Sequence, residues 1–114
     1  MTPGASELAE VLAALETVLR ARRGADPKRS YTAGLYAAGP DAILKKIGEE
    51  AAEVLLAAKN PDRAQLVHEL ADLWFHTLVL MAAYDVPLSA LGAELARRMG
   101  RSGLEEKAAR GACP

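Results

Sequence analysis

Cysteine and aromatic residues are scarce in this sequence, and each shortage excludes a class of protein. Among 114 residues there are one Cys, one Trp, one Phe and three Tyr. The single cysteine, Cys113, leaves no internal disulfide, which fits a reducing cytosol. Few aromatic and β-branched residues argue against a β-sheet, whereas abundant alanine and leucine favour helices. The composition therefore predicts an all-α protein.

The sequence also lacks a clear excess of positive or negative residues. The formal net charge is −1, with 14 Lys and Arg residues against 15 Asp and Glu residues. No overall field draws such a chain to nucleic acid or to a membrane surface. The start lacks the basic and apolar runs of a secretory signal, and the most apolar stretch, residues 70–84, is too short and too polar to span a bilayer. We therefore expect a cytoplasmic protein that binds neither nucleic acid nor membrane.

Apolar periodicity and stop signals divide the chain into about five helices. We expect one domain over residues 1–114, with flexible ends at 1–5 and 111–114. The expected helices span residues 6–23, 40–59, 62–84 and 88–99, and a short last helix begins at Ser102. The stretch between the first two helices shows no clear period and is expected to be a loop. Because the link at Asn60-Pro61 is short, the second and third helices should form an antiparallel hairpin.

The third of these helices is apolar in nearly every direction. Its apolar residues are Leu66, Val67, Leu70, Leu73, Trp74, Phe75, Leu78, Val79, Leu80 and Met81. A helix that is apolar all round is buried all round. One short chain can hardly cover it. We therefore infer an obligate homodimer, or a larger assembly of dimers, in which the hairpin completes a four-helix bundle.

Two pairs of acids interrupt the hairpin. Glu50 and Glu53 are neighbours on one face of its first helix, and Glu69 and Asp72 share a sector of its second. If these faces pack together, four carboxylates converge and repel one another unless protons or cations neutralise them. Oxygen ligands without a thiol favour Mg²⁺, or Mn²⁺, and such ions commonly bind substrate phosphates as well. The pattern indicates a phosphate-processing metal site, with acids on a solvated helix face as the alternative.

Four segments carry a resemblance to a known family. They are Ser30-Tyr31-Thr32 with Leu35, residues 45–50 (KKIGEE), residues 69–73 (ELADL) with His76, and residues 102–107 (SGLEEK). With the acid motif Glu49-Glu50-x-x-Glu53 and Glu69-x-x-Asp72, they resemble the MazG-like superfamily of all-α nucleoside triphosphate pyrophosphatases. Within it they look like the phosphoribosyl-ATP pyrophosphatase family of histidine biosynthesis. The loop departs from the family pattern near Leu35, where a polar residue is expected.

The resemblance implies a dimeric hydrolase that cleaves phosphoribosyl-ATP into phosphoribosyl-AMP and pyrophosphate. It also implies that Glu50, Glu53, Glu69 and Asp72 bind the metal, with Glu49 as a further acid at the site. We interpret Glu49 as the general base, because its offset position leaves it free of the metal. The alternative is a glutamate that merely faces solvent.

The anionic nucleotide substrate should be surrounded by basic and polar side chains. Lys46 shares the acid sector and is the first candidate, with an ion pair to Glu50 as its alternative. Further candidates lie in the loop and the tail, with a polar connector or a helix-end cation as their alternatives: Arg29, Ser30, Tyr31, Thr32, Arg101 and Lys107. His76 is interpreted as a hydrogen-bonded core residue, with orientation of a metal-binding carboxylate as the alternative.

Two other functions stay open. A housecleaning nucleotide pyrophosphatase of the same superfamily would have the same metal site, although residues 30–32 and 102–107 argue against it. A non-enzymatic dimerisation module would carry solvated acids and bind no metal. A di-iron carboxylate bundle is excluded, because its Glu-x-x-His pairs are absent.

Overall fold

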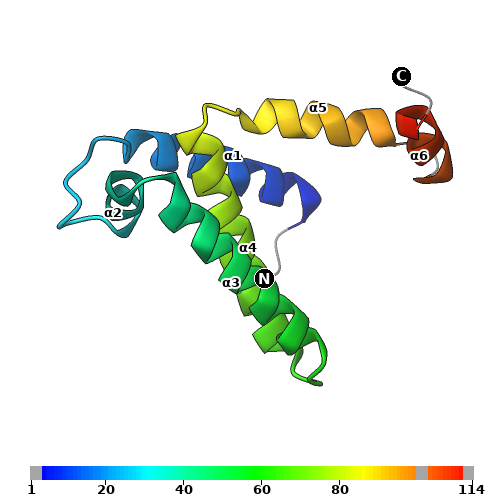
Figure 1. Cartoon of the computed structure of the whole chain (residues 1–114), viewed down its shortest axis with the longest axis horizontal. Helices are drawn as coiled ribbons and strands as arrows, with labels where there is room; N and C mark the ends of the chain where they lie inside the picture. The colour runs from blue at the N-terminus through cyan, green and yellow to red at the C-terminus, as the bar shows by residue number, and fades with distance from the viewer. Residues whose placement is uncertain (1–3, 100–102, 112–114) are drawn as a thin grey trace.

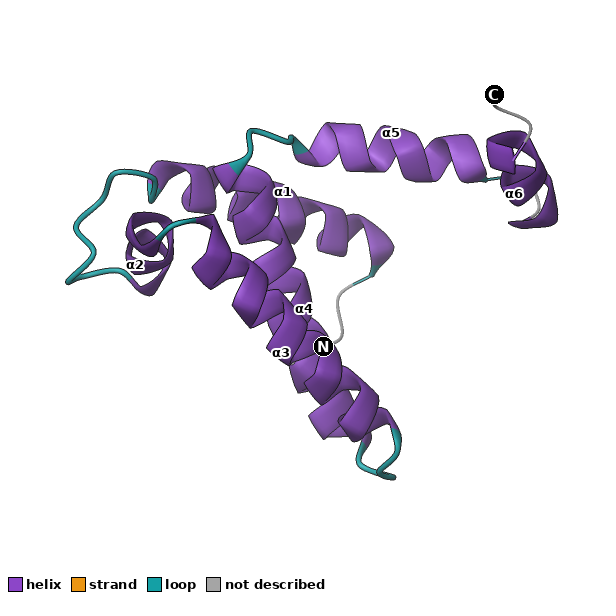
Figure 2. Ribbon diagram, viewed as in Figure 1, coloured by secondary structure: helices purple, strands orange, loops and turns teal. Residues whose placement is uncertain are grey.

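The computed structural model describes residues 4–99 and 103–111, which fold into helices and their connections (Figure 1, Figure 2). The helices are α1 (Ala5–Ala21), α2 (Tyr31–Ala38), α3 (Pro40–Ala58), α4 (Arg63–Ala83), α5 (Leu88–Arg98) and α6 (Gly103–Gly111). No strand occurs in these two ranges, and the predicted all-α class is confirmed. The ends predicted to be flexible lie partly outside the described residues, and Arg101 and Ser102 lie wholly outside them.

The predicted antiparallel hairpin is formed by α3 and α4, which run side by side (Figure 1). α3 begins with Pro40, directly after Gly39, whose φ of 100° lies in the left-handed region that favours glycine. α4 begins after Asp62, whose side chain accepts a hydrogen bond of 3.1 Å from the Gln65 backbone N–H. Only residues 59–62 separate the two helices, so α4 has to fold back along α3.

The segment predicted to be an irregular loop contains a further helix, α2. The Ser30 hydroxyl caps it by accepting a hydrogen bond of 3.1 Å from the Ala33 backbone N–H. The helix buries Thr32, Ala33 and Leu35. Its 8 residues are too few to show an apolar period, which is why the sequence pattern missed it. The described residues therefore form six helices where about five were expected.

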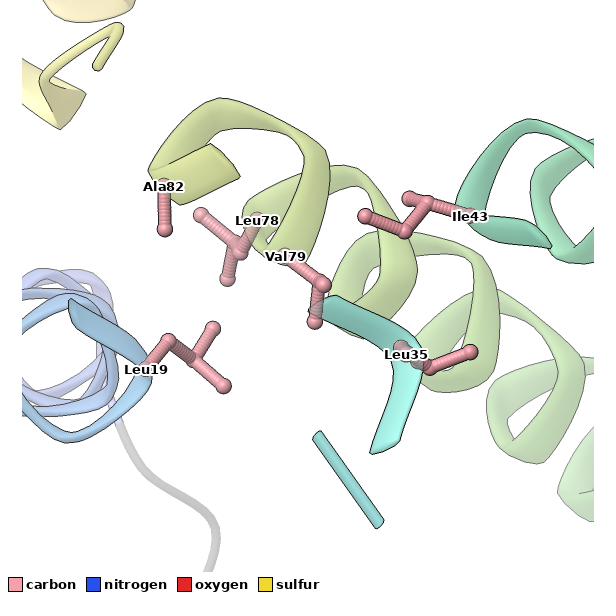
Figure 3. Close-up of a cluster of buried hydrophobic side chains, with 6 residues drawn as sticks. All are labelled: Leu19, Leu35, Ile43, Leu78, Val79 and Ala82. Carbon is pink, nitrogen blue, oxygen red and sulfur yellow. The ribbon is translucent and has the colours of Figure 1, made fainter. Parts of the chain in front are cut away.

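The core lies at one end of the hairpin, where α1 and α2 pack against it (Figure 1). Its buried side chains, drawn in Figure 3, are Leu19, Leu35, Ile43, Leu78, Val79 and Ala82. The Tyr36 hydroxyl ties α2 to α1 by donating a hydrogen bond of 2.9 Å to the Leu19 carbonyl. The other end of the hairpin has no such cover, and Leu55, Leu56 and Val67 are 69%, 67% and 59% exposed. The single chain thus buries only one half of its hairpin well.

An open apolar groove lies between α1, α4 and α5. The start of α5 is held by the Leu88 backbone N–H, which donates a hydrogen bond of 2.6 Å to Glu16 Oε2. The groove has a volume of about 540 Å³ and is lined by apolar residues of the three helices, among them Trp74. Trp74 is half exposed here, so the groove leaves its ring without full cover.

By length and composition, α4 is the one described helix that could cross a membrane. Its middle, however, carries Glu69 and Asp72, and its last turns bury Leu78 and Val79 in the core. These features are typical of the central helix of a folded core, which is often apolar on most sides.

Candidate metal centre

Four acids from the two hairpin helices meet in the middle of the hairpin. One carboxylate oxygen from each of Glu50, Glu53, Glu69 and Asp72 lies within 4.8 Å of those of the other three. We call these residues the four-carboxylate cluster. Spacing of three along each helix places both of its acids on the face that meets the other helix. The structure therefore brings together the acids that the sequence pattern paired.

Two members of the cluster bury an oxygen that has no partner. Glu50 and Glu69 are 5% and 8% exposed, and Oε2 of each makes no hydrogen bond within the described residues. Their Oε1 atoms do have polar partners. Glu69 Oε1 accepts a hydrogen bond of 2.6 Å from Gln65 Nε2, and Glu50 Oε1 lies 3.7 Å from Lys46 Nζ. A buried carboxylate oxygen without a partner is costly. Neutralisation by a cation would remove this cost for both residues.

The pKa shifts of the cluster carboxyls also favour a bound cation. Burial raises the pKa of Glu50, and the neighbouring Glu53 and Asp72 raise it further. The adjacent Glu53 carboxyl, which could share a proton with Glu69, is the largest cause that raises the pKa of Glu69, and burial adds to the shift. Burial and the neighbouring carboxyls both disfavour the ionised forms, so each residue holds its proton more tightly than an isolated carboxyl. A bound divalent cation would take the place of those protons.

The donor set fits a hard divalent cation. All four groups are carboxylates, and Mg²⁺ and Mn²⁺ prefer such oxygen ligands. A histidine that the sequence pattern did not indicate lies beside the cluster, because His68 Nε2 is 3.3 Å from Asp72 Oδ2. The two residues are four apart on α4, and that spacing was the available signal. With Glu69 and Asp72, His68 forms a second group whose ligand atoms lie within 4.8 Å of one another.

Lys46 stands beside the cluster as predicted. Its Nζ lies 3.7 Å from Glu50 Oε1, so the ion pair considered as the alternative is formed. The Tyr31 phenol contributes most to raising the pKa of Lys46, and the acids of α3 contribute less. The side chain is 36% exposed, which leaves its ammonium accessible from solvent.

The other predicted site residues fall into three groups. Glu49 is exposed and is not one of the four acids that converge. Arg29 is also exposed, whereas the Ser30 hydroxyl caps α2 and Thr32 is buried. Lys107 lies on α6, far from the hairpin in Figure 1. Within the described residues, a single chain thus brings Tyr31 close to the acids through His76, whereas α6 lies far from them.

Known proteins of similar sequence identify the family of this chain. The sequence model described as phosphoribosyl-ATP pyrophosphohydrolase matches residues 12–99. A phosphoribosyl-ATP pyrophosphatase of Bordetella avium is 56% identical over 107 residues, which cover 94% of this chain and 91% of the relative. One of Methylibium petroleiphilum is 52% identical over 101 residues, covering 89% and 84%. One of Neisseria gonorrhoeae is 51% identical over 100 residues, covering 88% and 94%.

Proposed function

The chain belongs to the phosphoribosyl-ATP pyrophosphohydrolase family, and we propose that the four-carboxylate cluster is its catalytic metal centre. Its reaction is the hydrolysis of phosphoribosyl-ATP to phosphoribosyl-AMP and pyrophosphate, a step of histidine biosynthesis. Membership of this family decides against the two other functions that the sequence left open. The observation that carries the proposal is the pair of buried oxygens, on Glu50 and Glu69, that lack a hydrogen-bond partner in the described part of the chain.

We assign Mg²⁺ to the centre, with Mn²⁺ as the alternative ion. Glu50, Glu53, Glu69 and Asp72 would hold it, because they offer four carboxylate oxygens close together. Mg²⁺ keeps several waters and commonly binds substrate phosphates as well as carboxylates. Such an ion would suit a substrate that presents a triphosphate.

The proposed chemistry divides the work among residues of α3. Hydrolysis forms a bond from a water oxygen to the α-phosphorus and breaks the bond to the oxygen that leads to the β-phosphate. A divalent cation, when bound, neutralises phosphate oxygens and lowers the pKa of a coordinated water. Glu49 is proposed to accept the proton of the attacking water, since its carboxylate is exposed and stands outside the four-carboxylate cluster. Lys46 is proposed to donate to a phosphate oxygen beside Glu50.

The remaining substrate contacts are proposed at the start of α2 and in the tail. Arg29, Ser30, Tyr31 and Thr32 lie where α2 begins, and the Tyr31 side chain reaches α4. This end of α2 is therefore next to the cluster, where a phosphate on the second ribose could bind. Lys107 is proposed to act at the site of a second copy, because α6 is remote from the hairpin of its own chain (Figure 1). Arg101, which lies outside the described residues, is proposed as a further substrate contact.

We also propose that two copies of the chain form a homodimer through the exposed apolar surfaces. The hairpin end exposes Leu55, Leu56 and Val67, and the groove beside α4 leaves Trp74 half exposed. Monomeric proteins rarely expose apolar surface over so much of their length. A second hairpin packed on these surfaces would complete the four-helix bundle that the sequence predicts. Residence in the cytoplasm remains our proposal for such an enzyme.

The proposed centre can be tested by product analysis and metal binding together. Wild-type protein with phosphoribosyl-ATP and Mg²⁺ should release pyrophosphate, and release of orthophosphate would contradict the assignment. Glu53→Gln removes an exposed member of the cluster and should weaken Mn²⁺ binding by at least about tenfold. Glu10→Gln, on the exposed surface of α1, is the matched control and should change neither measurement. Unchanged Mn²⁺ affinity in Glu53→Gln would overturn the proposed centre.

A further inference from the structure

His76 is a buried histidine whose contacts the proposed reaction does not use. It lies on α4, one turn after Asp72, and is 5% exposed. Its Nε2 lies 2.8 Å from the Tyr31 hydroxyl, and its Nδ1 lies 2.9 Å from the Asp72 backbone carbonyl. The same Nδ1 lies 3.5 Å from Glu50 Oε1. The imidazole therefore stands between the first residue of α2 and a member of the four-carboxylate cluster.

The partners of the ring fix where its proton sits. Nδ1 lies 2.9 Å from the Asp72 backbone carbonyl, which can only accept a hydrogen bond, and the ionised Glu50 carboxylate beyond it can likewise only accept. Nδ1 must therefore carry the hydrogen in the neutral ring. Nε2 is then an acceptor, and the Tyr31 hydroxyl donates to it. The ring of Tyr31 also meets that of His76 edge to face, with centroids 5.8 Å apart, which holds the imidazole plane.

The two carboxylate oxygens of Glu50 have different surroundings. Oε1 faces His76 Nδ1 at 3.5 Å and Lys46 Nζ at 3.7 Å. Oε2 is buried and has no partner within the described ranges. Neither contact is a hydrogen bond, but the N–H dipole of His76 and the charge of Lys46 both attract Oε1 and so favour one orientation of the carboxylate, in which Oε2 is left to bind a cation. In metal sites, groups that hold a ligand in this way set its orientation and raise affinity.

We propose that Tyr31 and His76 are positioning residues that hold Glu50 in its metal-binding orientation and so link the start of α2 to the metal centre. This inference rests on the proposed metal centre. It changes the role given to Tyr31, because its hydroxyl serves His76 and not the substrate. It also gives a target, Glu50, to the alternative role considered for His76, orientation of a metal-binding carboxylate.

The link predicts a defect in metal binding rather than in substrate binding. Loss of a group that orients a metal ligand weakens metal affinity by about 10- to 100-fold. Tyr31→Phe removes only the hydroxyl and should weaken Mn²⁺ binding within this range. With Mn²⁺ at saturating concentration, kcat should fall while KM for phosphoribosyl-ATP stays the same, since the substrate loses no contact.

The matched control comes from the same helix. Tyr36→Phe also removes one hydroxyl of α2 that donates a hydrogen bond, in this case 2.9 Å long and to the Leu19 carbonyl. It should lower the melting temperature without changing Mn²⁺ affinity. His76→Asn keeps an N–H near the position of Nδ1 and should retain more Mn²⁺ affinity than His76→Ala. In a His76→Ala background, Tyr31→Phe should have no further effect on Mn²⁺ affinity, because the link is already broken.

Isothermal titration calorimetry with Mn²⁺ and steady-state kinetics separate the outcomes. If Tyr31→Phe raises KM and leaves Mn²⁺ affinity unchanged, Tyr31 contacts the substrate directly and the proposed link is wrong. Equal losses in Tyr31→Phe and Tyr36→Phe would also overturn it, since the effect would then be one of folding. If wild-type protein binds no Mn²⁺, the metal centre itself fails, which is a different result from either of these.

Discussion

Replacing one cluster carboxylate by its neutral isostere should stabilise the metal-free protein and abolish its response to metal. Glu50→Gln is the sharpest choice, because Glu50 is 5% exposed and its Oε2 has no partner among the residues that the structure describes. The oxygen of the substituted amide can keep the position of Oε1 near His76 Nδ1 and Lys46 Nζ. Its NH₂ group would replace Oε2 and donate to the remaining carboxylates. The change thus turns a repulsive contact into a hydrogen bond.

The size of the effect follows from the distances. Cluster oxygens lie within 4.8 Å of one another. Two unit charges at about that separation repel by about 3.5 kcal/mol at an effective dielectric constant of about 20. Protonation and the exposure of Glu53 reduce this value, so we expect a gain of about 1–2 kcal/mol in the free energy of unfolding. For a domain of this size, that gain corresponds to a rise of about 4–8 °C in melting temperature.

Differential scanning calorimetry in EDTA and in Mn²⁺, at one protein concentration, measures both halves of this prediction. Wild-type protein should melt at a lower temperature than Glu50→Gln in EDTA and at a higher one in saturating Mn²⁺. Glu10→Gln should follow the wild type in both buffers, because it removes an exposed charge from α1. A melting temperature of Glu50→Gln below that of the wild type in EDTA would refute the account of the cluster as a repulsive site.

Four further outcomes follow from the same geometry. In chelator, the free energy of unfolding should fall as pH rises above the ordinary Glu value of 4.5, because the raised pKa of Glu50 lets the folded chain keep a proton that the unfolded chain has lost. Chelator-treated protein melted at several pH values between about 5 and 8 checks this sign. Glu49→Gln should lower kcat by about 10²- to 10⁴-fold with unchanged Mn²⁺ affinity, and an unchanged kcat would leave Glu49 as a solvent-facing residue. Lys46→Gln should raise KM for phosphoribosyl-ATP by about tenfold or more, because the substrate loses one charge-assisted hydrogen bond. Initial-rate kinetics measure this change. Trp74→Glu should convert the homodimer to a monomer in sedimentation velocity, since it places a charge on the apolar groove.

The hairpin could be predicted from the sequence because its signals are local. Gly39-Pro40 starts α3, and the Asp62 cap starts α4, so neither boundary depends on the rest of the fold. α2 could not be predicted in the same way. Its stability comes from burying Leu35 and from the bond between Tyr36 and the α1 backbone, and both depend on partners distant in sequence. The Ser30 cap at its start and Gly39 at its end were the local signals that it left.

The candidate site, too, could be predicted only where its signals are local in sequence. Helical spacing alone places the four acids on facing surfaces of the hairpin, so their convergence follows from the sequence once the hairpin is accepted. The contact between Tyr31 and His76 could not be predicted, because it joins residues 45 apart through the position of α2. The alternative role of His76, orientation of a metal-binding carboxylate, rested only on its position one helical turn after Asp72. The structure shows that its Nδ1 faces the Asp72 backbone and Glu50.

The distribution of apolar and acidic residues along the hairpin explains why metal and dimer should depend on each other. One end is held by the core around Ile43 and Val79, and the middle carries the acids. Beyond the acids, Leu55 and Val67 are exposed in the single chain. Repulsion between the acids therefore acts on the half of the hairpin that the core does not reach. A cation that neutralises the acids and a second copy that covers the apolar end would stabilise the same half. By linkage, each should then strengthen the binding of the other by the same factor.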